Sequence, residues 1–274
     1  MTDRLEVTIL GCGSSGGVPR IGGPDGAGFW GACDPANPKN RRRRCSLLAQ
    51  RISDAGTSTV LVDTSPDMRE QLIDARISRL DAVLITHSHA DQLHGLDDLR
   101  MVAMNARRRI DVHCDAATFA DVMARFGYCF VQPANSDYPP ILNAHQIPEP
   151  FAPFALAGAG ADIPVHAFAM GHGNIECLGF RFGPIAYSSD VDNLDEKAFA
   201  ALAGVECWIV DALRYTPHPS HSHVAKTLGW IERVRPRLAV LTNLHVDLDY
   251  ETLRRELPPG VEPAYDGMLV SADF

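Results

Sequence analysis

The stretch ITHSHADQLH, from Ile85 to His94, follows the apolar run Ala82–Ile85. A short apolar run that leads into polar residues is typical of a buried strand ending in a loop. His87, His89 and Asp91 lie in that loop, and their alternate spacing lets the two histidines project to one side of an extended chain. Neutral imidazoles with a carboxylate suit Zn²⁺, Mn²⁺ or Fe²⁺. The segment therefore predicts a metal site; the alternative, a solvated turn, explains the clustering less well.

The segment resembles the HxHxDH signature of the metallo-β-lactamase superfamily. Four further elements of that superfamily occur in the expected order, each a strand-like run followed by an acidic residue or a histidine: Asp63 after Val60–Val62, His172 after Val165–Met170, Asp190 after Ile185–Tyr187, and His245 after Leu238–Thr242. The resemblance implies that Asp63 braces the histidine loop and that His87, His89, His172 and Asp190 hold one ion. It extends from Leu5 to about Tyr265 and implies an α/β fold, a four-layer αββα sandwich formed by a single domain over residues 1–274.

Within the superfamily, the chain is most similar to the PhnP-like branch, which contains the cyclic-phosphate phosphodiesterase of phosphonate catabolism. This similarity is carried by LGCGSSGGVP (Leu10–Pro19), RRRRCS (Arg41–Ser46), GLDDLR (Gly95–Arg100), PHPSH (Pro217–His221) and LGWIER (Leu228–Arg233). Each motif is weak alone, but their order and spacing are specific. The resemblance implies hydrolysis of a phosphodiester, with His221 as the catalytic loop histidine and Asp91 as both a ligand and a catalytic residue.

Two positions depart from the family pattern, and both belong to its second metal site. Gln92 stands where the signature has its last histidine, and Asn243 stands where the family commonly has the histidine of Leu-Thr-His. An amide oxygen is a weaker ligand for Zn²⁺ than imidazole, although harder ions accept it. His94 and His245 each follow two residues later, on the same side of an extended segment. We expect His245 to replace the lost ligand, whereas His94 either binds the ion or supports another ligand.

Ser14, Arg44 and His223 are expected to contact the substrate. Arginine forms bidentate contacts with phosphate, but a run such as Arg41–Arg44 is as often a solvated face. Ser14 lies in a glycine-rich turn that either offers N–H groups to an anion or is simply tight. For His223, and for His218 nearby, polar lining of the cleft without chemistry is the alternative.

Composition limits the remaining choices. The chain has 274 residues, 46% of them hydrophobic, and a net charge of −9, which argues against extended duplex nucleic acid as a partner. The seven cysteines are scattered without a CxxC pair, so neither a disulfide framework nor a zinc ribbon is expected. Met1–Arg4 leads directly into a strand-like run, and no apolar run is long enough to span a membrane. We therefore expect a cytoplasmic protein that does not bind membranes; a homodimer is compatible with the sequence.

Periodicity places the regular elements. Strands are expected at Leu5–Leu10, Ser46–Arg51, Thr59–Asp63, Ala82–Thr86, Val165–Met170, Cys177–Phe182, Pro184–Tyr187, Cys207–Asp211 and Leu238–Thr242. Helices are expected at Met68–Ala75, Leu96–Asn105, Ala116–Phe126, Glu196–Ala203, His223–Val234 and Tyr250–Glu256. Pro and Gly between Gln132 and Pro164 predict irregular connections around short strands.

Taken together, the residues and the resemblance predict a metal-dependent hydrolase with one or two Zn²⁺ or Mn²⁺ ions per chain. The expected reaction is hydrolysis of a phosphodiester in a small cyclic phosphate, a nucleotide or a short oligonucleotide, with His221 protonating the leaving alkoxide. Two alternatives remain open. One is a hydrolase of another ester class, a thioesterase or lactonase; the other is a degenerate protein that binds a nucleotide with little turnover.

Overall fold

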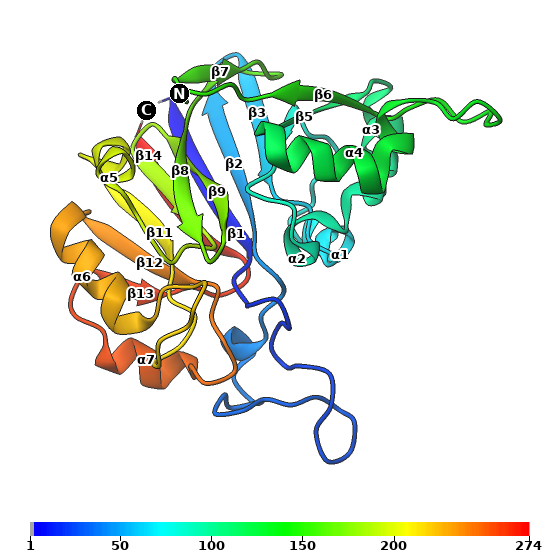
Figure 1. Cartoon of the computed structure of the whole chain (residues 1–274). Helices are drawn as coiled ribbons and strands as arrows, with labels where there is room; N and C mark the ends of the chain where they lie inside the picture. Colours follow the sequence, from blue (N-terminus) through cyan, green and yellow to red (C-terminus); the bar gives the residue numbers. More distant parts are fainter. Residues whose placement is uncertain (1–2, 274) are drawn as a thin grey trace.

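The computed structural model describes residues 3–273 and contains two seven-stranded sheets packed face to face, with helices on their outer faces (Figure 1). The first sheet has the order β14 (Met268–Asp273), β1 (Arg4–Gly11), β2 (Ser46–Ser53), β3 (Gly56–Val62), β4 (Ala82–Leu84), β5 (Ile110–Cys114) and β6 (Leu142–Gln146). The second has the order β13 (Val261–Pro263), β12 (Leu238–Thr242), β11 (Cys207–Asp211), β10 (Ile185–Ser188), β9 (Ile175–Phe182), β8 (Ile163–His172) and β7 (Phe154–Leu156). The predicted αββα sandwich is confirmed.

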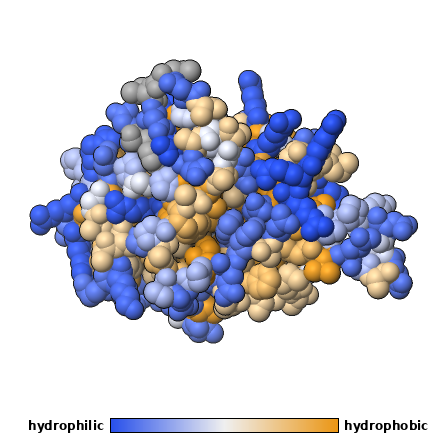
Figure 2. Space-filling model, turned by 90° about the horizontal axis from the view of Figure 1, so that it is seen from above, coloured by the Kyte–Doolittle hydropathy of each residue, from blue (hydrophilic) through white to orange (hydrophobic). Residues whose placement is uncertain are grey.

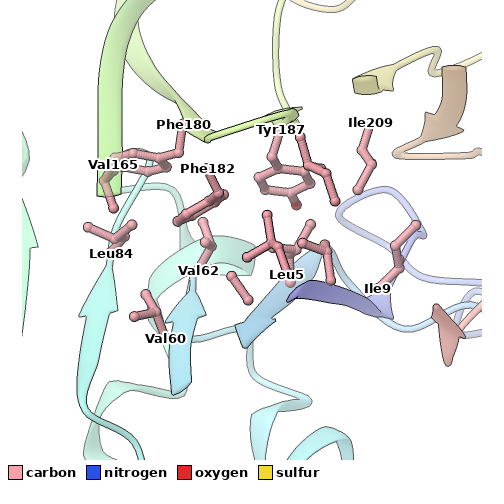
Figure 3. Packing of buried hydrophobic residues seen from close by; sticks show 14 of the residues in the cluster. Leu5, Ile9, Val60, Val62, Leu84, Val165, Phe180, Phe182, Tyr187 and Ile209 are labelled. Atoms are coloured by element: carbon pink, nitrogen blue, oxygen red, sulfur yellow. The ribbon is translucent and has the colours of Figure 1, made fainter. Parts of the chain in front are cut away.

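The core between the sheets is built by alternate residues of strands from both. On β1, Leu5 and Ile9 point inward and meet Phe180, Phe182 and Tyr187 of the opposite sheet (Figure 3). All five side chains are almost completely buried. Burying each such side chain stabilises the fold by about 1.5–3 kcal/mol, so this layer holds the two sheets together.

The outer faces of both sheets are covered by helices. The first sheet carries α1 (Met68–Asp74), α2 (Ala90–Leu93), α3 (Leu99–Ala106) and α4 (Ala116–Phe130), and the second carries α5 (Glu196–Leu202), α6 (Val224–Val234) and α7 (Tyr250–Glu256). The carboxyl-terminal part of β3, together with β10 and β11, is therefore buried on both faces, which explains the apolar runs Val60–Val62, Ile185–Tyr187 and Cys207–Val210. None of the helices in residues 3–273 combines the length and apolar character needed to cross a membrane.

Polar residues that follow strands of both sheets lie at one edge of the sandwich. Asp63 follows β3, His87 follows β4, and Asp190 and Asn243 follow β10 and β12. Because β3 and β4 are parallel, as are β10, β11 and β12, their carboxyl ends lie together within each sheet. This edge is where the sequence places its candidate site, and strand-end loops are the usual location of such sites.

A long segment between β1 and β2, residues 12–45, contacts loops at this edge from both sheets. Figure 1 shows that it runs from the end of β1 beyond the sandwich. Gly13 bridges to both Arg44 and Leu244. Arg42 is fully buried and donates hydrogen bonds to the carbonyl oxygens of Leu248 (2.7 Å) and His245 (3.3 Å). A residue of the arginine run thus connects the segment to the loop after β12.

Periodicity finds most of the helices and strands, including strands as short as β4. The bounds of β11, β12 and α7 agree with the expected ranges, and most others agree within a few residues. The four-residue α2 and the strands β5, β13 and β14 are not predicted. The irregular region Gln132–Pro164 contains β6 and β7, which extend the edges of the two sheets.

We predict that Arg42→Met destabilises the protein by about 3 kcal/mol, because it removes charged hydrogen bonds and leaves buried carbonyl groups unpaired. The matched control is Arg41→Met, since Arg41 is exposed and lies over the ring of Trp30 (5.3 Å to its centroid). Urea unfolding of both variants measures the difference in free energy. Equal, small effects at both positions would contradict the structural role assigned to Arg42.

Candidate metal centre

Three histidines from two sheets converge at the strand-end edge. His87 and His89 belong to the loop between β4 and α2, and His172 ends β8. One ring nitrogen from each lies within 4.8 Å of the others. The ring centroids are 4.6 Å apart for His87 and His89, and 5.0 Å apart for each of the other two pairs. The structure thus brings together the three imidazoles that the sequence assigned to one ion.

The chemistry of this group fits a divalent cation. The Nε2 atom of His87 is buried and has no hydrogen-bond partner among the described residues. Burial, together with the nearby His172 and His89, lowers the pKa of His87 well below its ordinary value. A neutral imidazole with an unpaired buried nitrogen is a ready metal ligand, and otherwise such a buried polar atom is costly.

Hydrogen bonds fix which nitrogen of each ring faces the group. The Nδ1 atom of His172 lies 2.6 Å from the carbonyl oxygen of Ser220, which only accepts, so Nδ1 carries the proton. The Thr86 hydroxyl donates to the Asp63 carboxylate (2.9 Å) and lies 3.0 Å from Nδ1 of His87. Nε2 of His87 and of His172 therefore faces the group unprotonated, and Nε2 of His172 lies 3.1 Å from Nδ1 of His89, a member of the same group. Asp63 acts as the expected brace of the histidine loop.

Asp190 joins this group from the opposite sheet. Its Oδ2 atom lies 3.8 Å from Nε2 of His87 and 3.9 Å from Nε2 of His172. Burial raises the pKa of Asp190 to about 8, so the carboxylate needs a nearby positive charge to stay ionised at neutral pH. A divalent cation at this point would provide it. His87, His89, His172 and Asp190 are thus the residues that could hold one ion.

His221 forms a second group with His172 and Asp190, with ligand atoms within 4.8 Å of one another. Its Nδ1 lies 2.9 Å from Oδ2 of Asp211, a fully buried carboxylate at the end of β11. Burial alone would lower the pKa of His221, but the hydrogen bond to Asp211 and its charge raise it to about 9. His221 therefore presents a proton beside the candidate metal position.

At the position expected for a second ion, the amide groups of Gln92 and Asn243 form hydrogen bonds with neighbouring residues. With its nitrogen turned toward Asp63 Oδ2 (3.1 Å) and Cys45 O (3.3 Å), the Gln92 amide satisfies both donor hydrogens and presents its oxygen toward Asp190. The Asn243 amide nitrogen donates to Oδ1 of Asp211 (3.2 Å). Neither residue contributes an imidazole, and Asn243 is committed to a carboxylate. Asp91 lies nearby, with its Oδ2 3.5 Å from that same amide oxygen of Gln92, but outside both histidine groups.

The two expected replacement histidines do not enter either group. His94 is exposed, and its ring packs against Phe126 at 5.8 Å. His245 has its Nδ1 3.0 Å from Asp247 Oδ2. The expectation assumed extended segments, and this assumption is wrong. Gln92 lies in the helix α2, and Asn243 has a left-handed backbone with φ of 60°, so a spacing of two residues does not preserve the side.

Of the expected substrate contacts, Ser14 is the one with a free group. Its hydroxyl is buried and has no hydrogen-bond partner among residues 3–273. Arg44 instead forms a two-point ion pair with Asp67, from Nε at 2.7 Å and from an amino group at 2.7 Å. His223 precedes α6 and makes no capping hydrogen bond with its side chain. The structure does not bring Arg44 or His223 into either histidine group.

Asp211 is a candidate site residue that the sequence did not single out. It follows the buried run Cys207–Val210, as Asp63 and Asp190 follow theirs. A carboxylate at the end of a fully apolar strand was thus a signal that could have identified it.

Comparisons with known proteins agree with this fold. A family model described as the beta-lactamase superfamily domain matches residues 58–243. A solved structure of a diphosphatase from the PhnP family has a TM-score of 0.85 and 30% identity, covering 100% of this chain and 99% of that one.

Two curated relatives have different activities in their names. An octanoyltransferase of Porphyromonas gingivalis is 32% identical over 274 residues, covering 98% of this chain and 52% of the relative. A ribonuclease Z of Bradyrhizobium is 30% identical over 150 residues, covering 53% of this chain and 46% of the relative. The chain spans about half the length of the curated relatives it matches.

We predict that the two metal positions are unequal: after mild chelation the wild-type protein retains about one ion per chain. Restoring imidazoles with Gln92→His and Asn243→His should strengthen the second position by on the order of ten-fold per ligand, by analogy with the effect of groups that merely support ligands. Metal analysis by mass spectrometry measures both, with His94→Gln as a control that leaves metal content unchanged. Two chelation-resistant ions in the wild type would contradict the assignment.

Proposed function

Since this chain belongs to the metallo-β-lactamase superfamily, in its PhnP-like branch, we propose that it is a metal-dependent phosphodiesterase. The proposed substrates are a small cyclic phosphate, a nucleotide or a short oligonucleotide. The members of this superfamily are metal-dependent hydrolases, so what we propose for this chain is its class of substrate. The diphosphatase of the PhnP family and the ribonuclease Z, which both act on phosphate bonds, support it.

The observation that carries the proposal is the position of His221. Its ring centroid lies 4.7 Å from that of His172, and its Nδ1 is held by Asp211. This arrangement leaves Nε2 as the nitrogen that can exchange a proton with a substrate bound at the metal group. A phosphodiester releases an alkoxide, which is a poor leaving group unless it is protonated.

The histidine group would hold Zn²⁺ or Mn²⁺, and its imidazole content favours Zn²⁺. Such an ion supplies a Lewis acid for the phosphoryl oxygen and lowers the pKa of a coordinated water. The chain's own residues orient the ligand histidines and supply the proton for the leaving group. Thr86, itself held by Asp63, and Ser220 keep His87 and His172 in one tautomer. Asp211 stabilises the protonated form of His221. His221 then transfers its proton to the departing oxygen and can recover it from water.

A second candidate function is hydrolysis of an acyl ester or thioester. It is favoured by the similarity to a relative named octanoyltransferase, which covers 98% of this chain. The same ligand set could polarise a carbonyl oxygen. The amides of Gln92 and Asn243 at the second position leave a third candidate, a protein that binds a nucleotide with little turnover.

The test is a substrate panel with wild-type protein and His221→Ala, each loaded with Zn²⁺ or Mn²⁺. We expect hydrolysis of a 2′,3′-cyclic nucleotide and of bis(4-nitrophenyl) phosphate, and little of an octanoyl thioester or a lactone. His221→Ala should slow the cyclic nucleotide by roughly 10²–10⁴-fold, the usual range for a positioned acid, because its alkoxide needs a proton. The nitrophenolate of the aryl ester needs none and should be affected much less.

The outcomes separate the candidates. Preference for the thioester would favour the acyl hydrolase, and binding of the nucleotide without turnover would favour the degenerate protein. Equal losses on both phosphodiesters would mean that His221 supports metal geometry rather than donating a proton. His223→Ala is the matched control, and a loss confined to it would move the role two residues along the loop.

A further inference from the structure

A cluster of exposed arginines lies at the end of the sandwich opposite the metal group. Arg79 precedes β4, and the run Arg107–Arg109 precedes β5. Because β3, β4 and β5 are parallel, their amino ends lie together, away from the edge that carries His87. Figure 2 views the molecule from this end and shows hydrophilic side chains that project from the surface. We call Arg76, Arg79 and Arg107–Arg109 the arginine cluster; all five residues are exposed.

Hydrogen bonds hold the two segments of the arginine cluster together. An amino group of Arg108 donates to the carbonyl oxygen of Leu80 (3.1 Å), and the side-chain amide of Asn105 donates to the carbonyl oxygen of Ser78 (3.4 Å). The same amino group of Arg108 lies 3.4 Å from Oδ1 of Asp81. Arg108 is therefore fixed in place by the segment that carries Arg79.

A cleft of about 250 Å³ opens between these segments and β3. Arg79 and Arg108 line it together with Thr57 and Thr59 of β3. The Thr59 hydroxyl accepts a hydrogen bond from the side-chain amide of Gln50 (3.2 Å), so its own proton can be donated to a ligand. The cleft thus combines two guanidinium groups with two hydroxyl groups, which suits an anion.

Most arginines of the cluster have no acidic partner. Apart from Arg108, none of them forms an ion pair within residues 3–273. The acid in the lining of the cleft is Asp81, which already accepts hydrogen bonds from the Thr59 amide (2.8 Å) and from Arg108 (3.4 Å). In a chain with a net charge of −9, four unpaired arginines beside one arginine–aspartate pair are a local concentration of positive charge.

Two members of the cluster stand where glycine is the usual residue. Arg76 and Arg107 follow α1 and α3 in the left-handed conformation, with φ of 57° and 53°. A side chain with a Cβ is strained there, and many helices end on glycine for this reason. A cation also stabilises a helix C-terminus, but Arg79 and Arg109 lie beyond the helices. Arginine at these positions costs the fold backbone strain, which points to a role in binding rather than in folding.

We propose that the arginine cluster binds a polyphosphate anion, either inorganic or the phosphate chain of a nucleotide, at a site separate from the metal group. One phosphate group would lie in the cleft between Arg79 and Arg108, and the next would meet the remaining arginines. Guanidinium groups form bidentate hydrogen bonds with phosphate oxygens, and successive phosphates match several positive charges. A concave site favours a small ligand over a macromolecule. The inference does not depend on the proposed phosphodiesterase function.

Calorimetry with the metal-loaded full chain tests the site, with tripolyphosphate, ATP and orthophosphate as probes. We expect the first two to bind about ten-fold or more tightly than orthophosphate, and Arg79→Gln to weaken their binding about ten-fold, the scale of one charge-assisted contact. The titrations are repeated in His172→Ala, which removes a candidate metal ligand and should leave these affinities unchanged. Loss of binding in His172→Ala would place the probes at the metal group and overturn the proposal.

Arg107→Gly separates binding from folding. Because glycine relieves the left-handed strain, we expect thermal stability to be retained or raised while the affinity for tripolyphosphate falls several-fold. Arg235→Gly is the matched control, since Arg235 ends α6 on the other sheet with φ of 57°. It should change stability in the same direction and keep the affinity. Equal losses of affinity in both glycine variants, or none in Arg79→Gln and Arg107→Gly, would overturn the proposal.

A single-stranded oligonucleotide and a hexaglutamate peptide complete the panel. Tighter binding of either one than of tripolyphosphate would overturn the proposal in favour of a macromolecular partner. Binding of ATP without binding of tripolyphosphate would also overturn it, because recognition would then depend on the nucleoside. Similar affinities for ATP and tripolyphosphate would support the phosphate chain as the group that the cluster binds.

Discussion

The hydrogen bonds donated by Nδ1 of His87 and His172 are the constraint on which the site depends. Each one leaves Nε2 unprotonated, and each is supplied by a different part of the fold. Thr86 and Asp63 come from the ends of β4 and β3, whereas Ser220 belongs to the loop before α6. The imidazoles therefore face a common point only if the two sheets keep one relative position. The core around Phe180 and Tyr187, which lies between the sheets, fixes that position.

The first metal group could be predicted from the sequence because most of its residues follow strongly apolar runs. Runs such as Val60–Val62 and Leu238–Leu241 are recognisable without a structure, and the polar residue after each one marks the same edge. Local backbone shape could not be read from the sequence. The short α2 and the left-handed Asn243 change the direction of the following side chains, so His94 and His245 lie outside both histidine groups. The ion pair between Arg44 and Asp67 could not be foreseen, because the two residues are distant in sequence.

At the position expected for a second ion, Gln92 and Asn243 replace imidazole ligands, and the neighbouring carboxylates have other partners. Asn243 and His221 both contact Asp211, and Gln92 approaches Asp63 and Asp190. The amides occupy hydrogen-bonding roles, and His221 supplies positive charge on the side where a second ion would otherwise lie. Under the proposed function, one ion would polarise the phosphoryl oxygen, and the protonated His221 would supply the positive charge that a second ion would otherwise provide.

The claim on which this account depends is that one ion binds the Nε2 atoms of His87 and His172 together with His89 and Asp190. X-ray absorption at the zinc edge of the Zn²⁺-loaded protein tests it most directly. The account predicts imidazole-dominated coordination with three nitrogen ligands at about 2.0–2.1 Å and one carboxylate oxygen, with one imidazole lost in His172→Ala. A spectrum without imidazole scattering, or one unchanged by His172→Ala, would contradict it.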